Sequence, residues 1–361
     1  MNPSSASSLF PPDLDPIISL LTTYNELNST SVDELTELPS PLEFMRYVAC
    51  NRPFVVRGGA ADWEATKTWD VATLKKLLEG QSVNVAVTPK GNADSPTLST
   101  SSELLFVKPH EEQQPFSTFI DYIVSQERSK DQASEVRYAQ TRRRSLLPPP
   151  LPPHLLKVPI NTISENDNLR NEYSSLFSHV DPDIPWARIA LSQTPEAINL
   201  WIGNSRSITA LHKDNYENIY VQIIGQKHFV LLPPLTYACV AEQELPAATY
   251  VRDESGGLLI VEDEGAEKVP FATWDPDVKP ESEGGRETRY SKFAEPMRVT
   301  LGEGDMLYLP ALWYHKVSQS CSEEGICCAA NYWHDMEFGG SFYSLCDFAR
   351  NTVKVALDKK G

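Results

Sequence analysis

The sequence predicts a mainly β fold with flanking helices, whose core is an antiparallel barrel or sandwich of the jelly-roll kind. Between Glu196 and Pro233, three strand-like segments follow one another: AINLWIG, SITALHKD and ENIYVQIIGQKHFVLLPP. Gly225 lies in the middle of the last segment, which is typical of a hairpin turn. Strands resume from Met297 in MRVTLGEGDMLYLP, HKVSQS and GICCAANYW. Many short strands separated by glycine and proline turns favour this architecture.

The rest of the chain divides into flanking regions. Residues 1–15 are polar and rich in proline and serine, so we expect them to be disordered. Residues 16–135 mix helix and strand patterns and are expected to pack on the barrel region, 136–340. Residues 341–361 are expected to close the chain as a helix. The individual elements predicted outside the barrel are helices at 16–27, 41–50, 71–80, 115–126 and 342–357, and strands at 53–56, 82–89 and 136–139.

Two polar stretches and one proline-rich stretch carry no regular pattern. Residues 90–103 are predicted to form a loop, and residues 241–295 a long connection. The proline run LLPPPLPPHLLKVP dominates residues 141–180 and predicts an extended surface insertion, because proline prevents helix and sheet pairing. Its chemistry leaves open a ligand for proline-recognising modules. The basic triplet 142–144 could be a solvated face or part of a localisation signal.

Charge and composition exclude several classes of protein. The formal net charge is -17, and such a field repels phosphates, so neither DNA nor RNA is expected as a partner. No apolar run is long enough to span a membrane, and the first residues lack the features of a secretory signal. The six cysteines are scattered without a CxxC pair, which favours a reducing compartment. We therefore expect a cytoplasmic or nuclear protein.

The candidate metal site begins with a His-x-Asp pair. Non-haem iron(II) oxygenases use two histidines and one carboxylate, and a His-x-Asp pair on a strand presents both side chains on one face. Three His-x-acid pairs occur, beginning at His110, His179 and His212. The first two lie in polar, proline-flanked stretches that predict loops. His212 and Asp214 lie between two strand patterns, but spacing alone leaves even this pair undecided.

Other residues near this pair strengthen the prediction. Lys227 lies in an otherwise apolar strand, where a buried cation needs an anion beside it, and a dicarboxylate would provide one. A lysine at the edge of the barrel whose amine reaches solvent is the alternative. Asn218 shares parity with Asp214 if the strand has no bulge. His315 follows the strand GDMLYLP and is the candidate third ligand, ahead of His228, which alternates with Lys227, and His334, which looks less enclosed.

These segments resemble those of the Jumonji-C (JmjC) hydroxylases of the cupin superfamily. The resemblance rests on TALHKDNYENIYVQIIGQKHFVLLPP, GDMLYLPALWYHKV and NYWHDMEF, with RPFVVRGGAADW and RYAQ upstream, and it covers about residues 40–350. It implies a double-stranded β-helix core. It also implies Fe(II) held by His212, Asp214 and His315, and 2-oxoglutarate as cosubstrate with O2. The residues implied to contact 2-oxoglutarate are Tyr138, Thr209, Asn218, Lys227 and Asn331.

Within the family, the small members that hydroxylate lysine side chains look closest, through LHKDNYEN, LYLPALW, ATY (248–250) and EKVP (267–270). The resemblance implies a protein substrate that is hydroxylated at lysine C-3, in GTP-binding proteins of the developmentally regulated class. Histone demethylation and histone-tail proteolysis are the alternative activities, and a cupin scaffold that only binds partners is the non-enzymatic one. The C-terminal helix could cover the barrel or form a homodimer contact, and the sequence does not decide between these.

Overall fold

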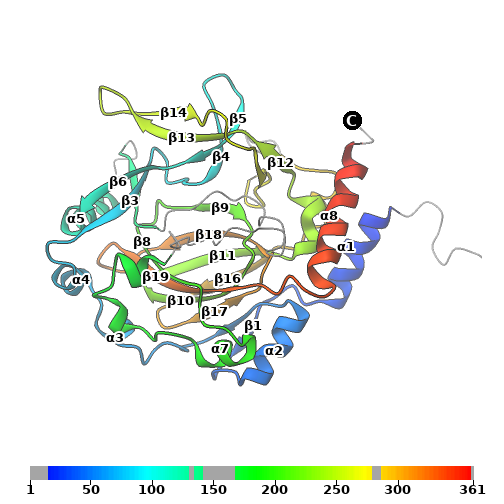
Figure 1. The fold of residues 1–361 in the computed structure, drawn as a ribbon, viewed down its shortest axis with the longest axis horizontal. Coiled ribbons are helices and arrows are strands. Elements are labelled where there is room, and N and C mark those ends of the chain that lie inside the picture. The colour runs from blue at the N-terminus through cyan, green and yellow to red at the C-terminus, as the bar shows by residue number, and fades with distance from the viewer. Residues whose placement is uncertain (1–14, 130–133, 141–166, 279–285, 359–361) are drawn as a thin grey trace, which may run out of the picture.

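The computed structural model describes residues 15–129, 134–140, 167–278 and 286–358, and its centre is a barrel of two facing sheets (Figure 1). The six-stranded sheet has the order β1(Asp33–Leu35), β2(Phe54–Val56), β17(Met306–Leu309), β10(Tyr216–Ile224), β19(Cys327–Asp335), β8(Ala197–Gly203). The four-stranded sheet has the order β16(Met297–Leu301), β11(Gln226–Leu232), β18(Tyr314–Ser320), β9(Thr209–His212).

The strands of the barrel alternate between the two sheets along the chain, except that β11 and β16 follow one another within the smaller sheet. β8, β10, β17 and β19 belong to the larger sheet, and β9, β11, β16 and β18 to the smaller one. This alternation is the double-stranded β-helix, so the predicted fold class is confirmed. The turn at Gly225 is present, with φ of 74°, and a side chain there would meet the carbonyl oxygen of Ser320 at 2.7 Å. The predicted hairpin is wrong, however, because β11 pairs with β16 and β18 and not with β10.

The outer face of the six-stranded sheet carries the main hydrophobic core. Ile219, Val221 and Ile223 of β10 point into it. Helices from both halves of the chain cover this face, and they lie along the bottom and left of Figure 1. These helices are α2(Pro41–Cys50), α3(Glu64–Thr68), α4(Val71–Leu77), α5(Phe116–Arg128), α6(Asn168–Asn171), η2(Phe177–His179) and α7(Pro185–Leu191).

Three smaller sheets cover one end of the barrel. Residues 90–103 and 241–295, predicted to be loops, contribute most of the strands in two of these sheets, so both predictions are wrong. The first of the three smaller sheets has four strands, in the order β14(Leu258–Glu262), β13(Ala247–Arg252), β5(Leu104–Lys108), β4(Ser95–Leu98). The others are β6(His110–Pro115), β3(Ser82–Thr88), β7(Val136–Tyr138), and the pair β12(Glu242–Leu245), β15(Val269–Ala272).

The predicted insertion 141–180 also needs correction. Residues 141–166, with the basic triplet and the proline run, lie outside the described residues. Residues 167–180 are not an extended surface segment, because they form α6 and η2 and bury Leu169, Tyr173 and Leu176 in the main core. The apolar spacing in this segment is helical, and burial of these side chains stabilises the turns.

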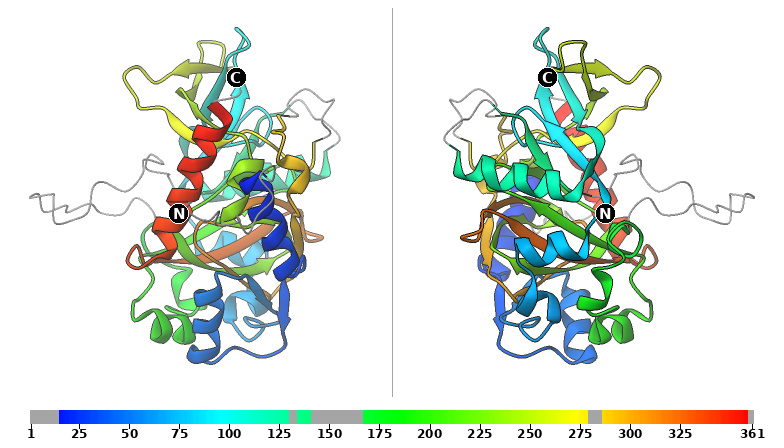
Figure 2. Two further views of the ribbon diagram at one scale, coloured as in Figure 1. Left: turned by 90° about the vertical axis from the view of Figure 1, so that its right-hand side faces the viewer. Right: turned by 90° about the vertical axis from the view of Figure 1, so that its left-hand side faces the viewer.

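The remaining helices pack at the other end of the barrel (Figures 1 and 2). α1(Pro16–Leu27) and α8(Phe342–Asp358) both contact η3(Pro234–Cys239), and η4(Ser291–Phe293) packs beside them. α8 buries Val353 there but leaves Leu345 and Phe348 exposed, at 62% and 69%. A dimer contact through α8 stays a prediction. No helix in the described ranges combines the length and apolar character that crossing a bilayer requires.

Candidate active site

The predicted metal-binding residues lie together at one end of the barrel. His212 ends β9 and pairs directly with His315 of β18, while Asp214 follows β9 by two residues. The Nε2 atoms of His212 and His315 lie 3.5 Å and 3.6 Å from Oδ2 of Asp214. One ligand atom from each residue lies within 4.8 Å of the others, and no other such group occurs among the described residues.

The two imidazoles are oriented for metal binding by the backbone. Nδ1 of His212 lies 2.8 Å from the carbonyl oxygen of Ala210, and Nδ1 of His315 lies 3.0 Å from that of Trp313. Because a carbonyl oxygen only accepts, each Nδ1 carries a proton, so in the neutral imidazole Nε2 is the atom whose lone pair a metal can take. Two neutral imidazoles and a carboxylate are the donor set of non-haem iron(II) oxygenases, so these residues fit that ion.

A buried lysine lies in the same pocket. The Nζ atom of Lys227 on β11 donates to the phenol oxygen of Tyr138 on β7 at 2.9 Å, and only 3% of the residue is exposed. Burial raises the pKa of Tyr138, so this phenol stays neutral. No carboxylate in the described part of the chain lies within ion-pair distance of Lys227. A neutral phenol leaves a buried cation uncompensated, which favours an anionic ligand.

A chain of side-chain hydrogen bonds lies along the wall of the pocket. Nδ2 of Asn331 donates to Asn218 at 3.1 Å, and Nε1 of Trp201 donates to Asn331 at 2.8 Å. These contacts orient the Asn331 amide, with its oxygen toward Trp201 and its nitrogen toward Asn218. All five predicted cosubstrate residues line the pocket, together with the metal triad; the five are Tyr138, Thr209, Asn218, Lys227 and Asn331.

Several residues of this pocket were not predicted from the sequence. Tyr220 lies on the same face of β10 as Asn218, so strand parity could have found it. Trp201 lies on β8 and stacks on Tyr138, with ring centroids 6.2 Å apart. Gly203 is needed beside them, because a Cβ there would lie 2.2 Å from the Tyr138 ring.

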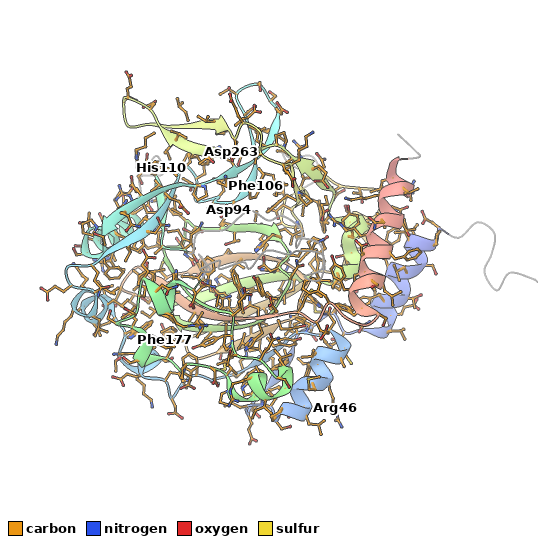
Figure 3. The ribbon with its side chains drawn as sticks, viewed as in Figure 1. Arg46, Asp94, Phe106, His110, Phe177 and Asp263 are labelled. Carbon is orange, nitrogen blue, oxygen red and sulfur yellow. The ribbon has the colours of Figure 1, made fainter. Side chains whose placement is uncertain are left out.

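Asp94 was also missed, because it lies in a turn whose residues show no periodicity. It lines the pocket from the turn between β3 and β4, is 7% exposed and accepts from Nε2 of Gln140 at 3.2 Å. Figure 3 shows it above β9. The turn is held in place because the backbone of Ile208 donates to the carbonyl of Gly91 at 2.9 Å.

The other candidate histidines lie elsewhere. His110 opens strand β6, so the predicted loop there is wrong, and His179 lies in η2, where Nε1 of Trp69 approaches its Nδ1 at 3.3 Å. His228 points away from Lys227, toward Thr300 and Ser320, as its parity predicted. His334 is fully buried, which corrects the expectation that it is less enclosed, and burial lowers its pKa to about 4.

Comparison with known proteins places this site in a family. Residues 39–340 match the cupin-like domain family. The lysine-specific demethylase JMJ32 of Arabidopsis thaliana is 35% identical over 316 residues, which are 86% of this chain and 83% of that protein. The chain is a JmjC oxygenase of the cupin-like family.

Two further JmjC relatives cover the chain to a similar extent. The bifunctional peptidase and (3S)-lysyl hydroxylase JMJD7 of Homo sapiens is 33% identical over 320 residues, 88% of this chain and 89% of that protein. The JmjC domain-containing protein E of Dictyostelium discoideum is 29% identical over 337 residues, 89% and 88% of the two chains. JmjC enzymes use Fe(II) and 2-oxoglutarate, and the His-Asp-His triad that this chemistry needs is present here.

Proposed function

We propose that the chain is an Fe(II)- and 2-oxoglutarate-dependent protein hydroxylase that oxidises a lysine side chain. The observation that carries the proposal is the His212, Asp214 and His315 triad in one pocket with the buried cation Lys227. The triad provides the donor atoms for Fe(II), and Lys227 provides the charge that a dicarboxylate needs. The bound groups would couple decarboxylation of 2-oxoglutarate to insertion of one oxygen atom into a C–H bond.

Different residues around the triad would bind the two ends of the cosubstrate. Lys227, Tyr138 and Thr209 would bind its distal carboxylate, since an ammonium and two hydroxyl groups can all donate to one anion. Asn218 and Asn331 would lie near the oxo-acid end, where the hydrogen bond from Trp201 fixes the orientation of the Asn331 amide. A cosubstrate fixed at both ends keeps its reactive atoms in register with the metal.

Three observations support a lysine substrate. Asp94 provides a carboxylate on the pocket wall, held by Gln140 and suited to a cationic side chain. The net charge of -17 attracts basic segments. One relative is named a (3S)-lysyl hydroxylase, which supports oxidation at C-3. By the same resemblance we propose a GTP-binding protein of the developmentally regulated class as substrate, encountered in the cytoplasm or nucleus.

A second candidate function is lysine demethylation, because another relative of similar identity is named a lysine-specific demethylase. The same metal and cosubstrate residues would serve it. In demethylation the oxygen atom enters an N-methyl group, whereas in hydroxylation it enters the lysine chain itself. Both activities would begin from the same site, so the mass change of the peptide distinguishes them.

Mass spectrometry of treated peptides tests the proposal. The protein is incubated with Fe(II), 2-oxoglutarate, ascorbate and either a lysine peptide from such a GTPase or a methylated histone peptide. We expect a gain of ~16 Da on the GTPase lysine, as insertion of one oxygen atom requires. A loss of roughly 14 Da from the methylated peptide alone would instead identify a demethylase.

Matched variants assign the turnover to the triad. We expect His212→Ala to abolish it and His110→Ala, which alters another His-x-acid pair, to retain it. Peptide cleavage that persists without 2-oxoglutarate would support the peptidase. If neither peptide is modified and neither metal nor 2-oxoglutarate binds, the oxygenase proposal fails. If the oxygenase proposal fails and His212→Ala still binds its partner normally, the result would support the alternative that the chain is a cupin scaffold that only binds partners.

A further inference from the structure

A second concave site lies on the opposite side of the six-stranded sheet from the metal pocket. β17 contributes to both, with Leu309 lining the metal pocket and Met306 lining the second site. We call this second site the α7 groove; it has a volume of about 800 Å3 and is lined by α7 and by residues before α2, around the start of α3 and around η2. That volume is within the range of about 300–1,000 Å3 typical of ligand sites.

The floor of the α7 groove is apolar and firmly built. Trp63 and Trp186 line it and are 8% and 6% exposed. The Trp186 ring packs on Phe44 of α2 with ring centroids 4.7 Å apart, which anchors α7 against α2. Aromatic side chains held in place at the base of a groove are the usual anchor points of protein interfaces.

The rim of the α7 groove exposes large apolar side chains. Leu38 and Ile189 line the rim and are 52% and 55% exposed. On the neighbouring α2, Leu42 and Met45 are 70% and 38% exposed. Exposed apolar side chains gathered around a concave site mark a surface that another molecule covers.

Charge at the rim identifies the chemistry of that molecule. Asp62, Glu64 and Asp181 line the groove, whereas the described lining residues include no lysine or arginine. Asp62 forms an ion pair with Lys67 at 2.9 Å. Among the described residues, Glu64 pairs only with His179, at 3.9 Å, and its side chain is 63% exposed. An apolar floor with an acidic rim is complementary to an amphipathic segment that carries lysine or arginine beside its apolar anchors.

We propose that the α7 groove is a docking site for a basic, amphipathic helical segment of a partner protein. Its apolar side chains contact Trp63, Trp186 and Ile189, while its cations face Glu64 and Asp181. The α7 groove is separate from the metal pocket. In the view of Figures 1 and 3, α7 and Arg46 of α2 lie at the bottom of the molecule, whereas Asp94 of the metal pocket lies above β9. Docking there therefore requires neither the metal nor the cosubstrate.

Fluorescence anisotropy with a defined probe tests this docking site. The probe is a short fluorescein-labelled helical peptide with leucines at i, i+4 and i+7 and lysines elsewhere. We expect saturable binding to the full chain that Ile189→Arg and Leu38→Arg each weaken at least about tenfold, because they put a cation and extra bulk on the rim. Both side chains are exposed, so these variants keep the fold.

The controls separate groove binding from attraction to an acidic protein. Leu259→Arg makes the same charge change at a residue that is also 55% exposed but lies on β14, and it should bind the probe like wild type. A probe with its leucines replaced by alanine keeps the charge and should not bind. His212→Ala should bind normally, which keeps this test independent of the oxygenase activity.

Three outcomes would overturn the proposal. The first is an absence of saturable binding, and the second is equal binding by the wild type, Ile189→Arg and Leu259→Arg. The third comes from sedimentation equilibrium: a wild-type dimer that Ile189→Arg dissociates would show that a second copy of the chain occupies the α7 groove.

Discussion

At the residue scale, adjacent side chains on β11 have opposite environments. Lys227 points into the pocket and is 3% exposed, whereas His228 points outward to Thr300 and Ser320. A buried ammonium that donates to a neutral phenol is costly to the free protein, since both groups have left water. An anion in the pocket would recover that cost. The lysine is therefore expected to lower the stability of the free protein and raise its affinity for a dicarboxylate.

Replacing this lysine tests both effects. We expect Lys227→Met to weaken 2-oxoglutarate binding by about 10–100-fold, because a charge-assisted hydrogen bond contributes about 1.5–3 kcal/mol. The free protein should unfold at the same or a higher temperature, as no cation remains buried. Calorimetric titration and thermal unfolding measure the two quantities. His228→Gln changes the neighbouring outward residue and should leave 2-oxoglutarate binding intact, while a large loss of stability in Lys227→Met would contradict this account.

Site residues whose role shows in the neighbouring sequence could be predicted, whereas those whose role depends on distant segments could not. Strand parity placed His212 and Asp214 on one face, and the apolar surroundings of Lys227 indicated a buried cation. The structure brings all three together, although Asp214 lies two residues beyond the end of β9. Trp201 and Gly203 were not predicted, because their roles come from β7 packing on β8, a contact between segments far apart in the sequence. Asp94 lies in a turn, where periodicity gives no information.

At the scale of elements, α8 and β12 are joined by hydrogen bonds and ion pairs to residues next to the metal ligands. Lys213, between two triad residues, donates to Glu242 of β12 at 3.3 Å and to the hydroxyl of Tyr314 at 3.1 Å. Arg350 of α8 donates to the same carboxylate. Burial alone would raise the pKa of Glu242, but Lys213 and Arg350 outweigh it and hold the pKa below its usual value. One carboxylate thus connects the neighbours of His212 and His315 to the C-terminal helix.

Removing this carboxylate should destabilise the protein in a pH-dependent way. We expect Glu242→Gln to lower the free energy of unfolding by about 3 kcal/mol at neutral pH, because two partly buried cations lose their partner. A lowered pKa gives stability that is present above the unfolded pKa and lost as pH falls through the folded one. The difference from wild type should therefore shrink below about pH 4.5 in denaturant titrations.

Glu244→Gln is the matched control for this prediction. Glu244 lies on the same strand and pairs with Lys354 of the same helix at 3.4 Å, but its side chain is 51% exposed. An exposed ion pair contributes about 0–1 kcal/mol, so this variant should unfold almost like wild type. Equal destabilisation by both variants, or a difference for Glu242→Gln that does not change with pH, would contradict the role assigned to Glu242.

Elements with strong periodicity were predictable, and elements whose pairing depends on distant partners were not. The strands of the barrel were found, but their alternation between two sheets was not, because polarity patterns give the buried face and not the neighbouring strand. β13 and β14 were missed within an acidic stretch, where Leu259 and Val261 are half exposed and the pattern is weak. The buried turns at 167–180 follow a proline run that obscured their helical spacing.

At the scale of the whole molecule, charge and topology act together. The two faces of the six-stranded sheet carry different sites, the metal pocket inside the barrel and the α7 groove outside it. Both have a carboxylate in their lining that is not a metal ligand, Asp94 in the pocket and Glu64 in the groove. With a net charge of -17, the long-range field attracts the same basic partners that these local carboxylates would bind.

This field predicts a salt dependence that differs between substrates. Two peptides share one target lysine, which is flanked by arginines in the first and by serines in the second. We expect kcat/KM for the arginine-flanked peptide to fall about tenfold between roughly 0.01 M and 0.15 M salt, as the screening length drops from about 30 Å to about 8 Å. The serine-flanked peptide should change much less, because only its target lysine interacts with the field. Initial rates at each salt concentration measure this, and equal slopes for the two peptides would show that only contacts inside the pocket select the lysine.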